Sequence, residues 1–240
     1  MFRPGTAIPD DIKTWAISQL HSNSPALGIR TRDAEVKSWP QSMQPDLEER
    51  AIHFRLLQGG LLKNREIIDE KKRKALEAEL FHNHSMIEKD EMKFAHRNVY
   101  GKDQIRLRLM SFWFNHFTIG DVFMNEALLG HAMEEAILAN LNGSFSDMLY
   151  EVTTHPGMLT YLDNNENTGE ESNHGNWCKR QVDCQSGLND NLGRELLELH
   201  TVSPKAGYSE TDIRQTAKVL AGWGAYFDQS IKDLKEWNGT

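Results

Sequence analysis

The stretch "GLNDNLGRELLELHT", residues 187–201, places two carboxylates and a histidine among leucines. Glu195 and Glu198 are helix neighbours, so they can share a proton or a metal ion, or compete for an arginine. His200 diverges from Glu198 on the helical wheel, so the spacing is neither the Glu-x-x-His of di-iron bundles nor His-Glu-x-x-His. The pattern indicates either an acid–base site or a structural helix whose carboxylates pair with arginine and whose His200 caps the helix end.

A second histidine belongs to the stretch 104–117. His116 follows Ile105, Leu109 and Phe112 on one helical stripe, so we expect it to be largely buried. A buried histidine is either a satisfied core residue or a general acid–base group. The candidate acid–base residues of the chain are therefore Glu195, Glu198, His200 and His116.

The polar stretch "LDNNENTGEES" raises the question of a calcium loop. Asp163, Asn165 and Asn167 have the one-three-five spacing of an EF-hand, but the glycine comes one place late and the twelfth position is His174 instead of glutamate. We therefore expect a polar loop and assign no metal ligands. The chain has no P-loop, dinucleotide fingerprint or G-x-S-x-G motif, and we expect no cofactor.

Charge and hydropathy argue against two classes of partner. The 240 residues carry a formal net charge of −8, whereas a general nucleic-acid binder needs clustered lysine and arginine. No apolar run approaches the roughly 18 residues that span a bilayer, and the first residues lack the apolar segment of a signal peptide. The sequence therefore predicts no nucleic-acid partner, no membrane span and no signal peptide in this chain.

The two cysteines, Cys178 and Cys184, lie close together in one polar stretch. They can close a small disulfide loop in an oxidising compartment, and they would be two free thiols in the cytosol. A zinc site does not fit, because the spacing is not Cys-x-x-Cys and no second pair exists.

The elements that carry these residues are helices, because helical periodicity is frequent and alternating strand patterns are scarce. From 47 to 98 the composition is strongly helical, with breaks expected at residues 59–60 and 81–85. We therefore expect a long exposed helix over 67–80 that forms an antiparallel hairpin with 87–97.

Helix starts are marked by capping residues. Ser144 and Ser209 each precede an aspartate by three positions, as in a capping box, and Pro156 fits the first turn of a further helix. Residues 163–187 form a long polar loop. The apolar face of the helix after residue 190 consists of Leu192, Leu196 and Leu199.

These patterns predict an all-α fold: an irregular multi-helix domain with long polar loops. It comprises an N-terminal helix with a polar connection (1–46), a charged helical arm (47–100) and a helical core (101–240). The helix 211–220 has an apolar face that needs a packing partner.

Four stretches, in their order and spacing, resemble a bacterial family known only as domain of unknown function 1800. They are "FWFNHF" (112–117), "HPGMLTYLDN" (155–164), "GLNDNLGRELLELHT" (187–201) and "GYSETDIRQTAKVLAGW" (207–223). The resemblance is specific from about residue 104 to 223. This chain departs from it at Asp190, at Val202-Ser203, where Leu-Gly is usual, and at Ala221, where threonine is usual. The glutamates and histidines stay in place.

The resemblance implies an exported protein, often encoded beside a sulfatase-like family, with no established biochemical activity. An exported setting would suit a disulfide between Cys178 and Cys184. Because the family's domain is longer at both ends, we expect this chain to be an incomplete domain whose apolar residues after Gly222 are exposed. The resemblance also indicates that the shared polar residues form a site. Those expected to hold a substrate are Asn115, Asp163, Asn164, Asn191 and Arg194.

Two functions fit these residues. In a hydrolase-like enzyme, Glu195 or Glu198 would be the general base, and His116 or His200 would be the second acid–base group. In a non-catalytic scaffold, the same residues would form a buried polar network, and the protein would bind a partner such as the neighbouring sulfatase-like protein. In either case we expect an arginine other than Arg194 to contact Glu195, because an unpaired carboxylate at the core boundary is costly.

Overall fold

The computed structural model of the chain consists of helices and one short two-stranded hairpin, so the all-α prediction is confirmed. In the hairpin, strand β1 (Gly28–Arg30) pairs antiparallel with β2 (Val36–Ser38). The structure describes residues 9–20, 28–30, 36–38, 45, 49–51, 54, 70–100, 103–120, 125–181 and 186–224. No helix in these ranges is both long enough and apolar enough to cross a membrane.

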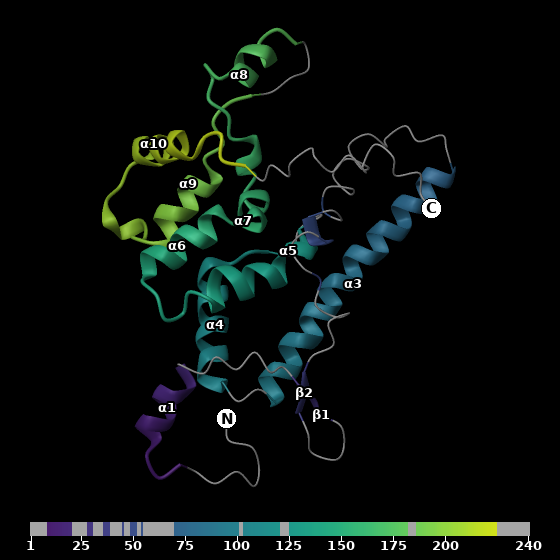
Figure 1. Cartoon of the computed structure of the whole chain (residues 1–240). Helices are drawn as coiled ribbons and strands as arrows, with labels where there is room; N and C mark the ends of the chain where they lie inside the picture. Colours follow the sequence, from purple (N-terminus) through teal and green to yellow (C-terminus); the bar gives the residue numbers. More distant parts are fainter. Residues whose placement is uncertain are drawn as a thin grey trace.

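The longest element is α3 (Glu70–Tyr100), a single helix of 31 residues that runs along one side of the molecule and packs on α5 (Figure 1). The expected break at residues 81–85 and the hairpin built on it are therefore wrong. Residues 81–85 contain neither glycine nor proline, and their helix propensities are only modestly unfavourable. A helix that has already formed continues through such a stretch, because propagation is much easier than nucleation.

The core lies among the helices that follow α3. The N-terminal helix α1 (Ile12–Leu20) packs against α4 (Gln104–Phe117). The chain continues through α5 (Glu126–His131), the π-helix η3 (Ala132–Leu138), α6 (Phe145–Thr154) and α7 (Pro156–Tyr161). Residues buried in this cluster include Leu107, Met110, Phe117, Ile137, Val152 and Met158.

The helix starts that the sequence predicts are confirmed. The Ser144 hydroxyl accepts a hydrogen bond from the Asp147 N–H at 3.1 Å, and Ser209 forms a complete capping box with Asp212. Pro156 occupies the first turn of α7. These caps depend only on neighbouring residues, so local sequence is sufficient to predict them.

The last part of the described chain packs on this core. It consists of η4 (Asn164–Glu166), α8 (Asn173–Cys178), α9 (Asn191–Glu195), the π-helix η5 (Leu196–His200), η6 (Pro204–Ala206) and α10 (Glu210–Leu220). The apolar face of α10 is buried against α9 through Ile213, Ala217 and Leu220. The apolar residues after 224, for which we expected exposure, lie outside the described residues.

The polar loop 163–187 has a fold of its own. It contains η4 and α8, and it is closed at its base where the Thr168 N–H donates to the Gly187 carbonyl at 2.9 Å. The described part of the segment that contains α8 projects from the body of the molecule (Figure 1). Cys178 on α8 is buried and disulfide-bonded. Cys184 lies outside the described residues, so its pairing with Cys178 stays a prediction.

A buried ion pair joins the N-terminal part of the chain to α3 and α5. Both terminal nitrogens of Arg50 bind the two carboxylate oxygens of Asp90 at 2.7 Å, and Arg50 also donates to the Ala127 carbonyl at 2.5 Å. Gly130 of α5 faces the same carboxylate, and a Cβ at this position would overlap it. The absence of a side chain at Gly130 is therefore what allows α5 to pack on α3 over the ion pair.

We predict that Gly130→Ala lowers the free energy of unfolding by about 2–4 kcal/mol, because Asp90 must leave Arg50 unpaired in the core. In an unobstructed helix the same change would stabilise by about 1 kcal/mol. Urea denaturation measures the effect, and Gly169→Ala is the control, because a Cβ there meets nothing within 4 Å. A Gly130→Ala protein as stable as this control would contradict the packing argument.

Candidate functional site

The two candidate histidines join the ends of α4 and η5 through reciprocal hydrogen bonds to the backbone. His116 Nε2 lies 3.1 Å from the His200 carbonyl oxygen, and His200 Nε2 lies 3.0 Å from the Phe117 carbonyl oxygen. Because carbonyl oxygens only accept, both Nε2 atoms carry the proton and donate. The ends of α4 and η5 therefore meet at these two bonds, and each ring joins its own helix to the other.

His200 is held in its neutral form. Only 2% of it is exposed, and burial lowers its pKa to about 4, with the Phe117 carbonyl raising the pKa and His116 lowering it further. Its remaining ring nitrogen, Nδ1, is buried and has no hydrogen-bond partner among the described residues. A nitrogen enclosed in this way is out of reach of a substrate.

Glu195 and Glu198 precede His200 on the same helix, and the two carboxylates have different surroundings. Arg194 binds Glu198 at 3.4 Å, Asp190 at 3.2 Å and Glu210 at 2.8 Å, so Glu198 is paired with arginine. Glu195 is half-buried, and burial together with the neighbouring Glu198 raises its pKa. Within the described part of the chain Glu195 forms neither a hydrogen bond nor an ion pair, so the expected contact with another arginine is not found there.

The helix that carries Glu195 and Glu198 changes from an α-helix to a π-helix at residue 196. The segment η5 is a π-helix, which inserts an extra residue per turn and rotates the side chains that follow. Leu192 is buried and Leu196 is packed against the core, but Leu199 is 59% exposed. The prediction that Leu199 shares the buried leucine face is wrong, because it assumed a regular α-helix.

Two asparagines of the loop 163–187 form a buried clamp on α10. The Asn164 side-chain amide donates to the carbonyls of Leu220 and Trp223, at 3.1 and 2.7 Å. Asn167 donates to the Asn164 side-chain oxygen at 3.0 Å and to the Ala217 carbonyl at 2.8 Å. Both side chains are 1% exposed. The amide of Asn164, which we expected to bind substrate, therefore holds the loop to α10.

The other residues expected to bind substrate are dispersed. Asn115, Asp163 and Asn191 are exposed, and their side chains make no hydrogen bond to the acid–base candidates within the described residues. Arg194 is bound to the three carboxylates named above. The structure thus brings together His116 with His200, and Arg194 with Glu198, but it does not assemble all nine residues around one point.

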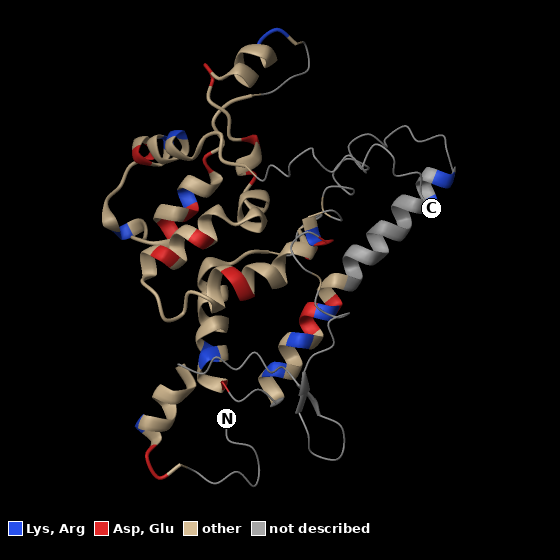
Figure 2. Ribbon diagram, viewed as in Figure 1, with Lys and Arg blue, Asp and Glu red and all other residues tan. Residues whose placement is uncertain are grey.

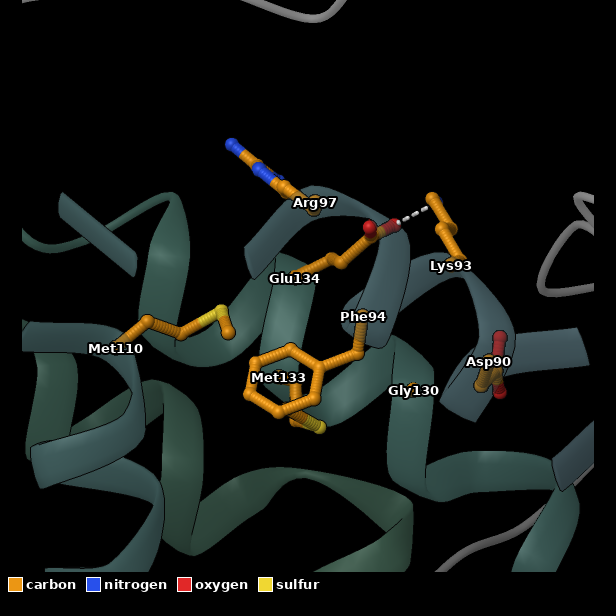
Figure 3. Close-up of a pocket in the computed structure, with 8 residues that line it drawn as sticks. All are labelled: Asp90, Lys93, Phe94, Arg97, Met110, Gly130, Met133 and Glu134. Carbon is orange, nitrogen blue, oxygen red and sulfur yellow. Dashed lines mark hydrogen bonds and ion pairs between the residues drawn. The ribbon is translucent and has the colours of Figure 1, made fainter. Parts of the chain in front are cut away.

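A small cavity lies elsewhere, between α3 and the helix formed by α5 and η3 (Figure 3). Its volume of about 20 Å³ has room for roughly one water molecule. Phe94, Met110 and Met133 line it with apolar side chains, and Lys93 binds Glu134 at 2.6 Å beside it. None of the nine candidate residues lines it. Across the ranges that the structure describes, no three histidine, cysteine or acidic residues are arranged to hold a metal ion.

A second histidine pair was missed from the sequence. His131 Nδ1, at the end of α5, lies 2.9 Å from His155 Nε2, at the junction of α6 and α7. The other ring nitrogen of His155, Nδ1, accepts the Gly157 N–H at 3.0 Å and so caps α7. Pro156 predicts the helix start, but no local pattern shows that a histidine 24 residues upstream lies beside its cap.

The segment after His200 contains a strained residue. Ser203 has φ 70° and ψ 158°, a backbone region that is populated almost only by glycine. It is the position at which the resembled family usually has glycine. The non-glycine residue in this conformation costs on the order of 1–3 kcal/mol.

We predict that Ser203→Gly raises the free energy of unfolding by about 1 kcal/mol, because relief of strain exceeds the entropy that glycine adds to the unfolded chain. Ala206→Gly, three residues later and without a positive φ, should lower it by about 0.5–1 kcal/mol. Chemical denaturation of both variants checks the opposite signs. If both substitutions changed the free energy of unfolding equally, Ser203 would not be strained.

We predict that the neutral His200 makes the protein sensitive to acid. Its pKa in the folded state lies below the unfolded value of about 6.5, so its contribution is complete above pH 6.5 and is lost as the pH falls toward 4. Between pH 7 and 5 this amounts to about 2 kcal/mol. His200→Gln keeps an N–H donor without titrating, so its unfolding free energy should fall by about 2 kcal/mol less over this interval. An unchanged pH dependence in urea titrations would contradict this.

Comparison with known proteins agrees with the resemblance noted in the sequence. No curated protein and no solved structure matches the chain. A family described as "Protein of unknown function (DUF1800)" matches residues 7–236, which include α1, the long helix α3 and both histidine pairs. The match covers nearly the whole chain, so the protein belongs to the DUF1800 family.

Proposed function

We propose that the chain is a helical scaffold protein that acts by binding a partner, and that its characteristic polar residues fix how the helices pack. The observation that carries this proposal is the reciprocal bond between His116 and His200. Each ring donates to a backbone carbonyl of the other helix. A catalytic base needs a lone pair that faces the substrate, whereas the free nitrogen of His200 is enclosed.

Further contacts support a framework role. Asn164 and Asn167 hold the loop 163–187 against α10 with hydrogen bonds to backbone carbonyls. Arg194 joins α9 to α10 through Glu210 and pairs with Glu198, although these ion pairs are partly exposed to solvent. Satisfied buried polar networks favour one packing of the helices over others. Of the positions shared with the family, His116, His200, Asn164 and Arg194 thus have a packing role that needs no reaction.

The sulfatase-like protein that the resemblance places beside this family is the partner to test first. Figure 2 shows several acidic positions on and beside α9, among which Arg194 pairs with Asp190, Glu198 and Glu210. Co-expression followed by size-exclusion chromatography and calorimetry would test the pair. A stable complex with a defined stoichiometry supports the scaffold, and no association at micromolar concentrations opposes this choice of partner.

A second candidate function, a hydrolase-like site, is favoured by one residue. Glu195 is half-buried, and it has no partner among the residues that the structure describes. Its pKa is raised by burial and by Glu198, as is common for catalytic acids. In this reading Glu195 would exchange protons with a substrate, and His116 would be the second acid–base group.

Stability measurements separate the two candidates. If His116 is a framework residue, His116→Ala should lower the free energy of unfolding by about 1–2 kcal/mol, the usual loss for one hydrogen bond with a part-buried partner. His116→Gln, which keeps an N–H donor, should recover most of this loss. Asn115→Ala, at the adjacent exposed position, is the control and should change stability by less than about 0.5 kcal/mol.

The opposite result would favour the enzyme. Catalytic residues are often destabilising, so their removal leaves stability unchanged or raises it. A His116→Ala protein that is as stable as the wild type would count against the scaffold. Glu195→Gln would then be the variant to compare with wild type against panels of ester, phosphate and sulfate substrates.

A further inference from the structure

The pair formed by His131 and His155 has a defined arrangement of protons. Gly157 N–H donates to His155 Nδ1, so this nitrogen carries no proton, and a neutral His155 must be protonated on Nε2. His155 Nε2 then donates to His131 Nδ1 across 2.9 Å. His131 in turn carries its proton on its own Nε2. One backbone N–H thus sets the tautomers of both rings.

This relay has no place for another proton. A proton on His155 Nδ1 would face the Gly157 N–H, and the cap of α7 would be lost. A proton on His131 Nδ1 would face the proton on His155 Nε2. If His155 moved its proton to Nδ1 to avoid this, the Gly157 bond would again break. Protonation of either ring therefore removes at least one of the two hydrogen bonds.

The pair is unsuited to catalysis or to metal binding. Both nitrogens of His155 and the basic nitrogen of His131 are occupied by the relay. The ring centroids are 5.2 Å apart with the nitrogens at 2.9 Å, so the two rings lie end to end along a hydrogen bond. Two histidines that shared a metal ion would instead converge on it at an angle.

The surroundings oppose a positive charge on His155. It is 6% exposed, and burial is the main cause of a pKa lowered to about 3, followed by His131 and Arg50. The pKa of His131 is also lowered, again mainly by burial. Charged residues from three parts of the chain act on His131. Glu135 and Glu134 of η3 and Asp90 of α3 raise its pKa, and Arg50, from the N-terminal part of the chain, lowers it.

We infer that the His131–His155 pair is an acid-sensitive latch that holds α7 against α5 at neutral pH and releases α7 when either ring gains a proton. The latch covers part of the core, because Met158 and Leu159 on α7 are buried immediately after the cap. The buried Asn125 side-chain oxygen beside Gly157 has no hydrogen-bond partner in the described structure, so it adds no bond that would keep the cap in place once the latch is protonated. Acidification would therefore open α7 before the remaining helices unfold.

Because the pKa values of both histidines are lowered, the latch becomes weaker as the pH falls. The neutral relay is fully formed above pH 6.5, the unfolded value of histidine, and its contribution is lost as the pH falls toward the folded values. Each pH unit in this interval weakens the protection of α7 by about tenfold for one proton bound.

Hydrogen exchange on the full 240-residue chain, corrected for the intrinsic pH dependence, tests the latch. Protection of the α7 amides should fall at least about tenfold relative to those of α10 between pH 6.5 and 5. In His155→Asn the cap is kept by a side chain that does not titrate, so α7 and α10 should change in parallel. His200→Gln, which alters the other buried pair, should keep the wild-type difference. Parallel changes in the wild type, or the same difference in His155→Asn, would overturn the inference.

A second measurement does not depend on the folding of a variant. Nitrogen-15 NMR of the imidazoles should show both rings protonated on Nε2 alone at pH 7.5. The loss of α7 protection should coincide with the appearance of a doubly protonated ring. A doubly protonated His131 or His155 in a protein whose α7 amides remain protected would also overturn the inference.

Discussion

The ion pair between Arg50 and Asp90 is the contact on which the arrangement of the helices depends. Its side chains are 5% and 12% exposed, so both charges have lost most of their water. Such a pair is tolerable only when its geometry is bidentate and its remaining donors are satisfied. Arg50 meets this condition by bonding the backbone of Ala127 on α5 as well as the carbonyl of Pro45. One side chain thus connects the N-terminal part of the chain with α3 and α5, and the packing of α5 positions His131 at its last turn.

Side-chain hydrogen bonds to backbone carbonyls occur at the ends of α4, η5 and α10. The bonds of His116, His200, Asn164 and Asn167 all reach carbonyls near the end of a helix, where the backbone lacks helical partners. Both π-helices adjoin a histidine pair: η3 begins directly after His131, and η5 ends at His200. A π turn changes the direction of the side chains beside it. The π turns of η3 and η5 and the histidine rings beside them therefore act together to join short helices.

The helices were predictable where the deciding interactions are local, as at Ser144, Ser209 and Pro156. The continuation of α3 through residues 81–85 was not predictable, because the helix propensities of these residues neither favour nor prevent a helix strongly. For the site, the residue types that take part could be picked out from the sequence, but the bonds of His116 and His200 to each other's backbone could not, because they depend on how the ends of α4 and η5 pack. The relay of His131 and His155 could not, since it depends on how α5 and α7 pack. Leu199 shows a third case, in which a π turn cancels the periodicity on which the prediction rested.

The closed base of the segment 168–187 has a consequence for how the chain can vary. Thr168 and Gly187 are joined by backbone and side-chain hydrogen bonds, so the two ends of this segment lie side by side on the body of the molecule. The cost of closing a flexible loop rises only by about 0.6 kcal/mol for each doubling of its length. Exposed positions of this segment can therefore be changed or extended while Asn164 and Asn167 still bind α10, provided that the buried, disulfide-bonded Cys178 is kept. This segment is the natural place for an epitope or a fluorophore that must leave the helical body undisturbed.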